Sequence, residues 1–98
     1  MSYWIHPEAE TELGDAAVYY ATEASLAIAE AFLAEYERVL ELLIENQQFG
    51  MHCEHGMRLY HFDRFPYTIF YAGNPLLGPQ VFAIAHQRRE PVYWAERV

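Results

Sequence analysis

Apolar residues recur at intervals of three and four in the first half of the chain, which predicts two consecutive helices. A short aromatic segment, Tyr3–Ile5, precedes them and is typical of a strand. Pro7 follows, a residue favoured in the first turn of a helix, and apolar positions keep helical spacing from there to about Tyr20. Ser25 is a typical N-cap, and it predicts a second helix that continues to about Asn46.

After this helix the apolar positions alternate, which predicts three strands at Arg58–Phe62, Tyr67–Tyr71 and Val81–His86. The third is the most apolar, so we expect it in the middle of the sheet. In the turn between the first two, Arg64 is expected to form an ion pair. Residues after Pro91 are expected to add a helical turn. The pattern predicts an α+β fold of order β-α-α-β-β-β, in which an antiparallel meander sheet packs on an N-terminal helical hairpin.

The composition predicts one domain without disulfides or membrane segments. Hydrophobic residues make up 53% of the 98 positions, which suffices for a single core. Cys53 is the only cysteine and cannot form an internal disulfide, as is usual in a reducing compartment. No apolar run approaches the ~20 residues of a membrane span. We therefore expect a single cytoplasmic domain over residues 1–98, with no membrane partner.

Charge is distributed unevenly along the chain, whose net charge is −8. Residues 1–50 carry ten acidic residues and one basic residue, Arg38, whereas residues 51–98 carry five arginines and four acidic residues. Lysine is absent. Such a chain lacks the broad basic surface with which proteins bind long nucleic acids. A local arginine cluster can still bind one phosphate or one acidic patch.

The last strand and the tail after it combine arginine and aromatic residues in a way that suggests recognition. Arginine binds carboxylates and phosphates in a fork, and tyrosine and tryptophan supply rigid contact area at binding hot spots. We therefore expect the tail to be an exposed contact surface, with target-binding residues Arg88, Arg89, Tyr93 and Trp94. A structural alternative stays open, in which the arginines pair with glutamates and Trp94 belongs to the core.

The segment His52-Cys53-Glu54-His55 contains side chains that can bind zinc. Structural zinc sites use four ligands at regular spacing, and this segment lacks a second ligand pair. We therefore expect no metal. Because the chain also lacks a glycine-rich phosphate loop, we expect no cofactor.

Five short sequence motifs occur in order along the chain: His6-Pro7-Glu8-Ala9-Glu10, Ala31-Phe32-Leu33, Gly56-Met57-Arg58, Arg64-Phe65-Pro66-Tyr67 and the closing segment His86–Trp94. Together they resemble the RelE/ParE toxin superfamily of bacterial type II toxin–antitoxin systems. The closing segment resembles the ParE-like, plasmid-stabilisation branch. The resemblance covers nearly the whole chain and implies the RelE/ParE toxin-like fold.

The resemblance also implies a function and partners. It implies a small toxin that a cognate antitoxin, encoded beside it, holds inactive in a toxin–antitoxin hetero-oligomer. ParE-like members bind DNA gyrase and block it, whereas RelE-like members cut messenger RNA on the ribosome with lysine, arginine and a tyrosine or histidine. Because this chain is acidic and has no lysine, our first expectation is a ParE-like inhibitor of a protein target such as gyrase. An inactive relative that only binds antitoxin is a third alternative.

If the protein were instead a RelE-like nuclease, its catalysis would need no metal. An arginine would stabilise charge on the phosphate, while a histidine or tyrosine moved the proton of the attacking 2′-hydroxyl. For this alternative the catalytic residues are Arg58, His86, Arg89 and Tyr93, which we expect to meet at one end of the meander.

Overall fold

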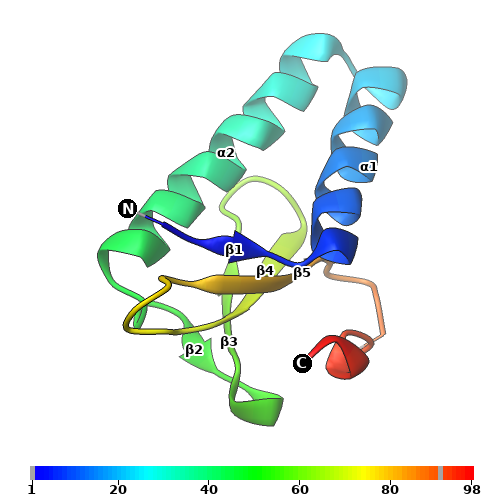
Figure 1. Ribbon diagram of the computed structural model, residues 1–98. Helices are drawn as coiled ribbons and strands as arrows, with labels where there is room; N and C mark the ends of the chain where they lie inside the picture. Colours follow the sequence, from blue (N-terminus) through cyan, green and yellow to red (C-terminus); the bar gives the residue numbers. More distant parts are fainter. Residues whose placement is uncertain (1, 91) are drawn as a thin grey trace.

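The computed structural model describes residues 2–90 and 92–98 and shows two helices on one face of a sheet (Figure 1). The order of elements is β1 (Trp4–Ile5), α1 (Pro7–Glu23), α2 (Leu26–Glu45), β2 (Met51–His52), β3 (Arg58–His61), β4 (Tyr67–Ala72) and β5 (Gln80–His86), with 3₁₀ turns at Glu54–Gly56 and Ala95–Arg97. The α+β class and the N-terminal helical hairpin are confirmed, and so is the helical turn near the C-terminus.

The sheet has five strands in the order β1-β5-β4-β3-β2. Strands β3, β4 and β5 form the expected antiparallel meander, whereas β1 pairs with β5 in parallel. The sheet is therefore mixed rather than wholly antiparallel. The middle strand is β4, so the expectation that the most apolar strand lies in the middle is wrong. Strands β1 and β2 each extend one edge, and β2 was missed because two exposed residues give no alternating pattern.

Both helices begin at the residues that the sequence indicates. The His6 side chain caps α1, because its Nδ1 accepts a hydrogen bond from the backbone N–H of Glu8 at 3.1 Å. Ser25 caps α2 in the same way and accepts from the N–H of Ile28 at 3.1 Å. Such caps satisfy N–H groups that a helix leaves without partners. No helix in the described part of the chain is long and apolar enough to cross a membrane.

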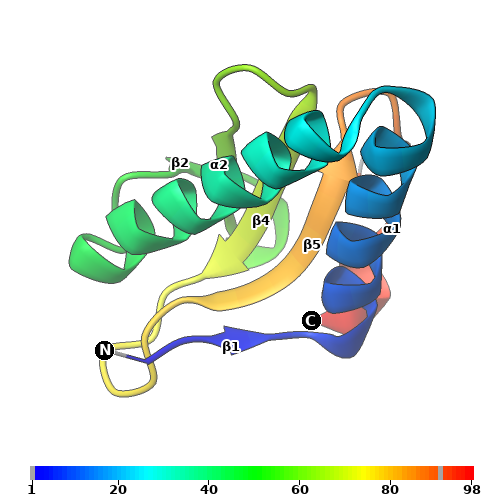
Figure 2. The ribbon, with the colours of Figure 1, turned by 90° about the horizontal axis from the view of Figure 1, so that it is seen from above.

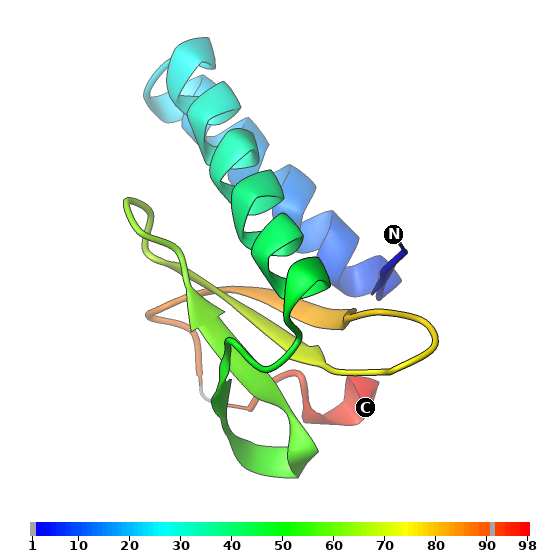
Figure 3. The ribbon, with the colours of Figure 1, turned by 90° about the vertical axis from the view of Figure 1, so that its left-hand side faces the viewer.

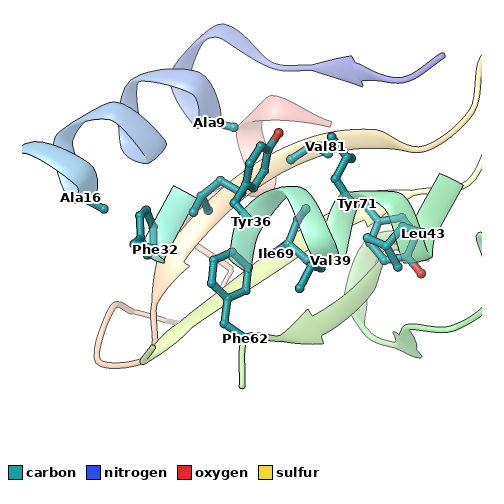
Figure 4. Close-up of a cluster of buried hydrophobic side chains, with 12 residues drawn as sticks. Ala9, Ala16, Phe32, Tyr36, Val39, Leu43, Phe62, Ile69, Tyr71 and Val81 are labelled. Atoms are coloured by element: carbon teal, nitrogen blue, oxygen red, sulfur yellow. The ribbon is translucent and has the colours of Figure 1, made fainter. Parts of the chain in front are cut away.

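The main core lies between α2 and the sheet, where α2 crosses the strands with α1 beside it (Figure 2). Figure 4 shows α2 directing an apolar stripe toward β4 and β5; its largest buried members are Phe32, Tyr36, Val39 and Leu43. Ile69 and Tyr71 of β4 meet this stripe and are both fully buried. The periodicity of the second helix therefore identified the correct face.

The C-terminal tail passes under the opposite face of the sheet (Figure 3). There Trp94 packs with Met57 and Ala83 in a second, smaller apolar cluster. Val92 enters this segment with φ 53°, a left-handed conformation that β-branched residues rarely adopt. Pro91, which belongs to the closing segment of the sequence resemblance, lies outside the described residues. The tail thus covers a sheet face that neither helix covers.

Candidate functional site

The register of the meander separates Arg58 from the other residues proposed for a nuclease. Arg58 pairs with Tyr71, which pairs with Val81 near the start of β5, whereas His86 at the end of β5 pairs with Tyr67. At ~3.3 Å per residue, Val81 and His86 lie roughly 16 Å apart. The expectation that Arg58 meets the residues at the end of β5 is wrong, because β3 and β5 run in the same direction. The start of β3 therefore lies level with the start of β5 and far from His86.

Arg58 instead holds the segment between α2 and β2. Its Nη1 donates to the backbone carbonyl oxygens of Gly50 at 2.7 Å and Gln48 at 3.2 Å. These carbonyls follow the C-terminus of α2, where the helix dipole favours a positive charge. Arg58 is therefore placed as a structural residue at the opposite end of the sheet from His86.

The other arginine and aromatic candidates do lie together at the end of β5. The Arg89 guanidinium lies 3.9 Å from the centre of the Tyr93 ring, a cation–π contact. His86 packs edge-on against Tyr67 with ring centres 5.2 Å apart, and its Nδ1 accepts from the N–H of Arg88 at 3.1 Å. Both arginine side chains are exposed. The structure places Arg88, Arg89, His86 and Tyr93 in one region, as the sequence predicted.

Trp94 is not exposed, so its expected availability to a target is wrong. Its side chain is 1% exposed, with its ring centre 5.0 Å from that of Phe70 and 5.8 Å from that of His55. The physical reason is that the outer face of the sheet carries apolar side chains and no helix covers it. Trp94 fills this space, as the structural alternative required.

Glu12, a residue of α1 that no sequence pattern indicated, organises the tail. The Glu12 carboxylate accepts four hydrogen bonds: from Ile84 N at 3.0 Å, from Tyr93 Oη at 2.8 Å, and from Arg97 Nη1 and Nη2 at 3.0 and 2.9 Å. Arg89 Nη1 lies 4.0 Å from the same carboxylate. One acidic side chain therefore joins α1, β5 and the tail, which we call the Glu12 node.

The Glu12 node also closes an open edge of the sheet. Strand β1 pairs only with the first residues of β5, which leaves the polar backbone groups of Phe82 and Ile84 facing outward. Arg97 donates to the Phe82 carbonyl oxygen at 3.0 Å, and Glu12 accepts from the Ile84 N–H. Two side chains thus take the place of a neighbouring strand, which protects an edge that could otherwise pair with another chain.

These contacts make Tyr93 a poor candidate for moving a proton. Burial raises the pKa of the Tyr93 hydroxyl well above its ordinary value, and the hydrogen bond to the Glu12 carboxylate raises it further. A general base should have a pKa near the working pH. The hydroxyl therefore acts as a donor that fixes the tail.

A groove of about 310 Å³ opens beside the tail on the outer face of the sheet. It is lined by His61, Thr68, Phe70, Ala85, His86, Gln87, Arg89, Glu90, Val92, Tyr93 and Trp94. The His61 Nδ1 and the Thr68 Oγ1 are hydrogen-bonded at 2.7 Å across its floor. Arg89 also borders two neighbouring hollows, so its guanidinium stands where three depressions meet. His61 of β3 also lines this groove.

Only part of the arginine set is available for contacts outside the chain. Three arginines are held by side-chain hydrogen bonds within the chain: Arg38 binds Glu35 and Asp63, Arg58 binds backbone carbonyls, and Arg97 binds Glu12. The other three are Arg64, Arg88 and Arg89, and all are exposed. Among residues 2–90 and 92–98, no carboxylate lies within 4.0 Å of Arg64, so its expected ion pair is wrong.

These three arginines lie at the same end of the sheet. Arg64 belongs to the turn between β3 and β4, and Arg88 and Arg89 follow β5. The two segments touch, because the Gln87 N–H donates to the Pro66 carbonyl oxygen at 2.8 Å. We call this surface, defined by Arg64, Arg88 and Arg89, the arginine end.

The segment His52-Cys53-Glu54-His55 forms part of β2 and the following 3₁₀ turn. In the described part of the chain, no three His, Cys, Asp or Glu side chains are grouped to hold a metal ion. The His55 ring packs on Trp94, and burial raises the pKa of the Cys53 thiol. These side chains therefore contribute to packing beneath the sheet.

Comparison with known proteins agrees with this architecture. The sequence model of the family described as "ParE toxin of type II toxin-antitoxin system, parDE" matches residues 3–91. No curated protein matches the sequence. A solved structure described as "Chromosomal ParDE TA system from P. aeruginosa" is similar with a TM-score of 0.75 and 19% sequence identity, covering 88% of this chain and 95% of that one.

At this identity the structural likeness shows the fold. The family match spans both helices and all five strands, which is the greater part of the chain. The RelE/ParE toxin-like fold expected from the five sequence motifs is confirmed, and the chain belongs to the ParE toxin family of type II toxin–antitoxin systems.

Proposed function

We propose that this ParE-type toxin arrests growth by binding a protein target and blocking it without chemistry of its own. DNA gyrase is our first candidate target. In the resting cell a cognate antitoxin holds the toxin inactive in a hetero-oligomer. The arginine end is the surface that contacts the target.

The arginine end carries this proposal. Arg64, Arg88 and Arg89 are exposed at one end of a molecule whose net charge is −8. Arginine is enriched at the energetic centres of protein interfaces, and it binds carboxylates in a fork. A small positive end on an acidic protein favours an acidic patch of a protein partner, because it cannot neutralise many phosphates of a duplex.

The positions of the proposed nuclease residues support binding rather than catalysis. Arg58 is bound to backbone carbonyls at the other end of the sheet. The pKa of Tyr93 is raised, and its hydroxyl already donates to Glu12. Trp94, one of our expected target-binding residues, is buried, so we propose that it supports Arg89 and Tyr93 from beneath rather than touching the target.

A gyrase supercoiling assay with the purified toxin tests the proposal. We expect inhibition by the wild-type protein and loss of inhibition in the double variant Arg88→Ala/Arg89→Ala. Glu23→Gln, an exposed substitution at the tip of the helical hairpin, serves as the control and should inhibit normally. Unchanged supercoiling with the wild-type toxin would rule out gyrase as the target.

Ribosome-dependent cleavage of messenger RNA is the second candidate, because His61, His86 and Arg89 line one groove beside the tail. Mapping RNA ends in cells that express the toxin separates the two candidates. New cleavage sites that disappear in His86→Ala would favour the nuclease. Unchanged transcripts together with arrested growth would favour the binding mechanism, and unaffected growth would indicate an inactive antitoxin-binding relative.

A further inference from the structure

The loop between β4 and β5, residues 73–79, presents two leucines to solvent at the end of the sheet away from the arginine end. Leu76 is 89% exposed and Leu77 is 54% exposed. Figure 2 shows this loop on the same side of the molecule as the C-terminal end of α2. Single exposed leucines are common on protein surfaces and need no explanation. Two neighbouring features, a rigid support and a hollow, distinguish these leucines.

The backbone of the loop is held in one conformation by hydrogen bonds. The Asn74 Oδ1 accepts from the backbone N–H groups of Leu76 at 2.9 Å and Leu77 at 2.8 Å. The Gln47 side chain binds both backbone groups of Asn74: its Nε2 donates to the carbonyl oxygen at 3.0 Å, and its Oε1 accepts from the N–H at 2.6 Å. The loop is therefore ordered before any partner arrives, which lowers the entropic cost of binding.

A hollow of about 510 Å³ opens directly beside the loop. Its walls are residues 44–48 at the end of α2, Arg58 at the start of β3, and residues 73–75 of the loop itself. A cavity of about 150 Å³ already holds a benzene ring, so this hollow can admit a leucine side chain. An exposed leucine and a hollow that can receive one thus lie side by side. We call Leu76, Leu77 and the lining of the hollow the loop face.

The charges of the loop face cancel, although the net charge of the whole chain is −8. Of the described residues that line the hollow, only Glu45 and Arg58 are charged, and residues 73–79 contain no charged residue. Glu45 forms no ion pair within the ranges 2–90 and 92–98. Arg58 uses only its Nη1 for the backbone carbonyls that it holds. One carboxylate and the rest of one guanidinium therefore remain available on this face.

These features identify a second copy of the chain as the occupant. A two-fold axis brings the same surface of two molecules together, so a projection and a hollow that lie side by side can fill each other twice. In the same arrangement, each Glu45 can pair with the Arg58 of the other copy. Two chains of charge −8 repel each other as wholes, and a face whose own charges cancel is where they can approach.

We propose that the toxin forms a two-fold symmetric dimer through the loop face, with Leu76 of each copy in the hollow of the other. This contact goes beyond the proposed function, because it uses neither the arginine end nor the target. The arginine end follows the last residues of β5, whereas the loop precedes its first residues. Both arginine ends therefore stay accessible in the dimer, which can bind a target with two sites more tightly than a monomer does.

Sedimentation velocity of the purified toxin, without antitoxin, measures the association directly. The wild type should form a dimer that dissociates on dilution. Leu76→Asp should raise the Kd of the dimer about a hundredfold or more, because each dimer contains the substitution twice. Leu26→Asp makes the same change at an exposed leucine of α2, outside the loop face, and should dimerise as the wild type does. A wild type that stays monomeric at its highest soluble concentration, or equal effects of the two variants, would overturn the proposal.

Two further variants test the hollow without altering the loop. Gln48→Trp places a large side chain in the hollow and should weaken dimerisation about tenfold or more. Glu45→Arg sets a second cation against Arg58 and should have a similar effect, although a positive charge at the end of α2 favours the folded monomer. Glu41→Arg, one turn earlier and outside the hollow, is the matched control and should dimerise normally. Thermal unfolding checks that each variant is folded. Normal dimerisation of both hollow variants would overturn the proposal.

Disulfide trapping locates the contact. In a Cys53→Ala background, Leu76→Cys mixed with Gln48→Cys should give a covalent dimer under mild oxidation. Leu26→Cys mixed with Gln48→Cys should not. Equal yields of covalent dimer from the two mixtures would indicate random collision and would overturn the proposal.

The antitoxin is the alternative occupant of the loop face. Its binding to the wild type and to Leu76→Asp is compared by surface plasmon resonance, and we expect equal affinities. A monomeric wild type together with weaker antitoxin binding by Leu76→Asp would assign the surface to the antitoxin and overturn the dimer. Because none of these measurements involves gyrase, their outcome is independent of the proposed target.

Discussion

Two glutamates, Glu12 on α1 and Glu35 on α2, perform the same local chemistry in different parts of the molecule. Each carboxylate accepts one hydrogen bond from a backbone N–H and a bidentate pair of hydrogen bonds from an arginine. The donors are Ile84 and Arg97 for Glu12, and Asp63 and Arg38 for Glu35. Both glutamate side chains are largely buried, with 16% and 8% exposure. The bonds of each carboxylate compensate for its removal from water.

The two glutamates differ in where their arginines come from. Arg38 lies three residues from Glu35 on the same helix and is 44% exposed, whereas Arg97 comes from the end of the chain and is 10% exposed. Loss of Glu35 leaves a cation that water can solvate. Loss of Glu12 leaves a buried guanidinium whose remaining carboxylate is the exposed Glu8 at 3.7 Å, and it removes the hydrogen bonds that join the tail to α1. Similar sets of hydrogen bonds should therefore differ in their contribution to stability.

The largest effect is expected for Glu12→Ala. Removing one partner of a buried pair typically costs about 3–5 kcal/mol, and here the Ile84 N–H also loses its acceptor. We expect a loss of that size in the free energy of unfolding, measured by urea denaturation. Glu10→Ala, an exposed substitution on the same helix, should change stability by no more than about 0.5 kcal/mol. A loss below about 1 kcal/mol for Glu12→Ala would show that the tail is not held through this carboxylate.

A smaller effect is expected for Glu35→Ala. The substitution leaves the Asp63 N–H without its acceptor, which costs about 1–3 kcal/mol, while Arg38 keeps Asp63 as a partner. Urea denaturation should place this variant between the wild type and Glu12→Ala. Glu37→Ala, two positions along and exposed, is the matched control. If Glu35→Ala lowered the free energy of unfolding more than Glu12→Ala does, burial of the arginine would not explain the difference between the two glutamates.

The pH dependence of stability tests the ionised state of Glu35. The hydrogen bond from Arg38 holds the pKa of this carboxyl below its ordinary value in the folded protein. Its contribution is therefore present above the pKa of the unfolded chain, about 4.3, and is lost as the pH falls through the folded value. The difference in unfolding free energy between wild type and Glu35→Gln should be largest near neutral pH and shrink in acid. A difference independent of pH would show that the carboxylate charge contributes nothing.

The same contrast explains what could be predicted from the sequence. Local signals were sufficient for the helices: Ser25 and Pro7 mark their starts, and the apolar period of α2 identified its buried face. The pair Glu35 and Arg38 has the spacing of a helical ion pair. Features within a few residues of one another are thus visible in the pattern.

The candidate site could be predicted only in part, because its decisive contacts are remote in sequence. Glu12 and Arg97 are separated by 85 positions, and nothing in either local segment indicates the other. Trp94 was misplaced because a tryptophan at a chain end suits a binding hot spot and an uncovered sheet face equally well. The misplacement of Arg58 was avoidable. Alternate strands of a meander run in the same direction, so the start of β3 lies level with the start of β5 and far from His86 at its end.

The smallest effect on stability, and the largest on function, is expected for Arg89→Ala. Arg89 lies beside Glu12 at 4.0 Å, but its side chain is 55% exposed, so the pair is screened and contributes little. Loss of the contact with Tyr93 should cost less than about 1 kcal/mol in unfolding free energy. Growth arrest on induction without antitoxin should nevertheless be relieved, while antitoxin still binds. Glu90→Ala, the exposed neighbour, should leave both stability and growth arrest unchanged. Equal losses of stability and toxicity in Arg89→Ala would make Arg89 a further member of the Glu12 node rather than a contact residue, and the arginine end would then be reduced to Arg64 and Arg88.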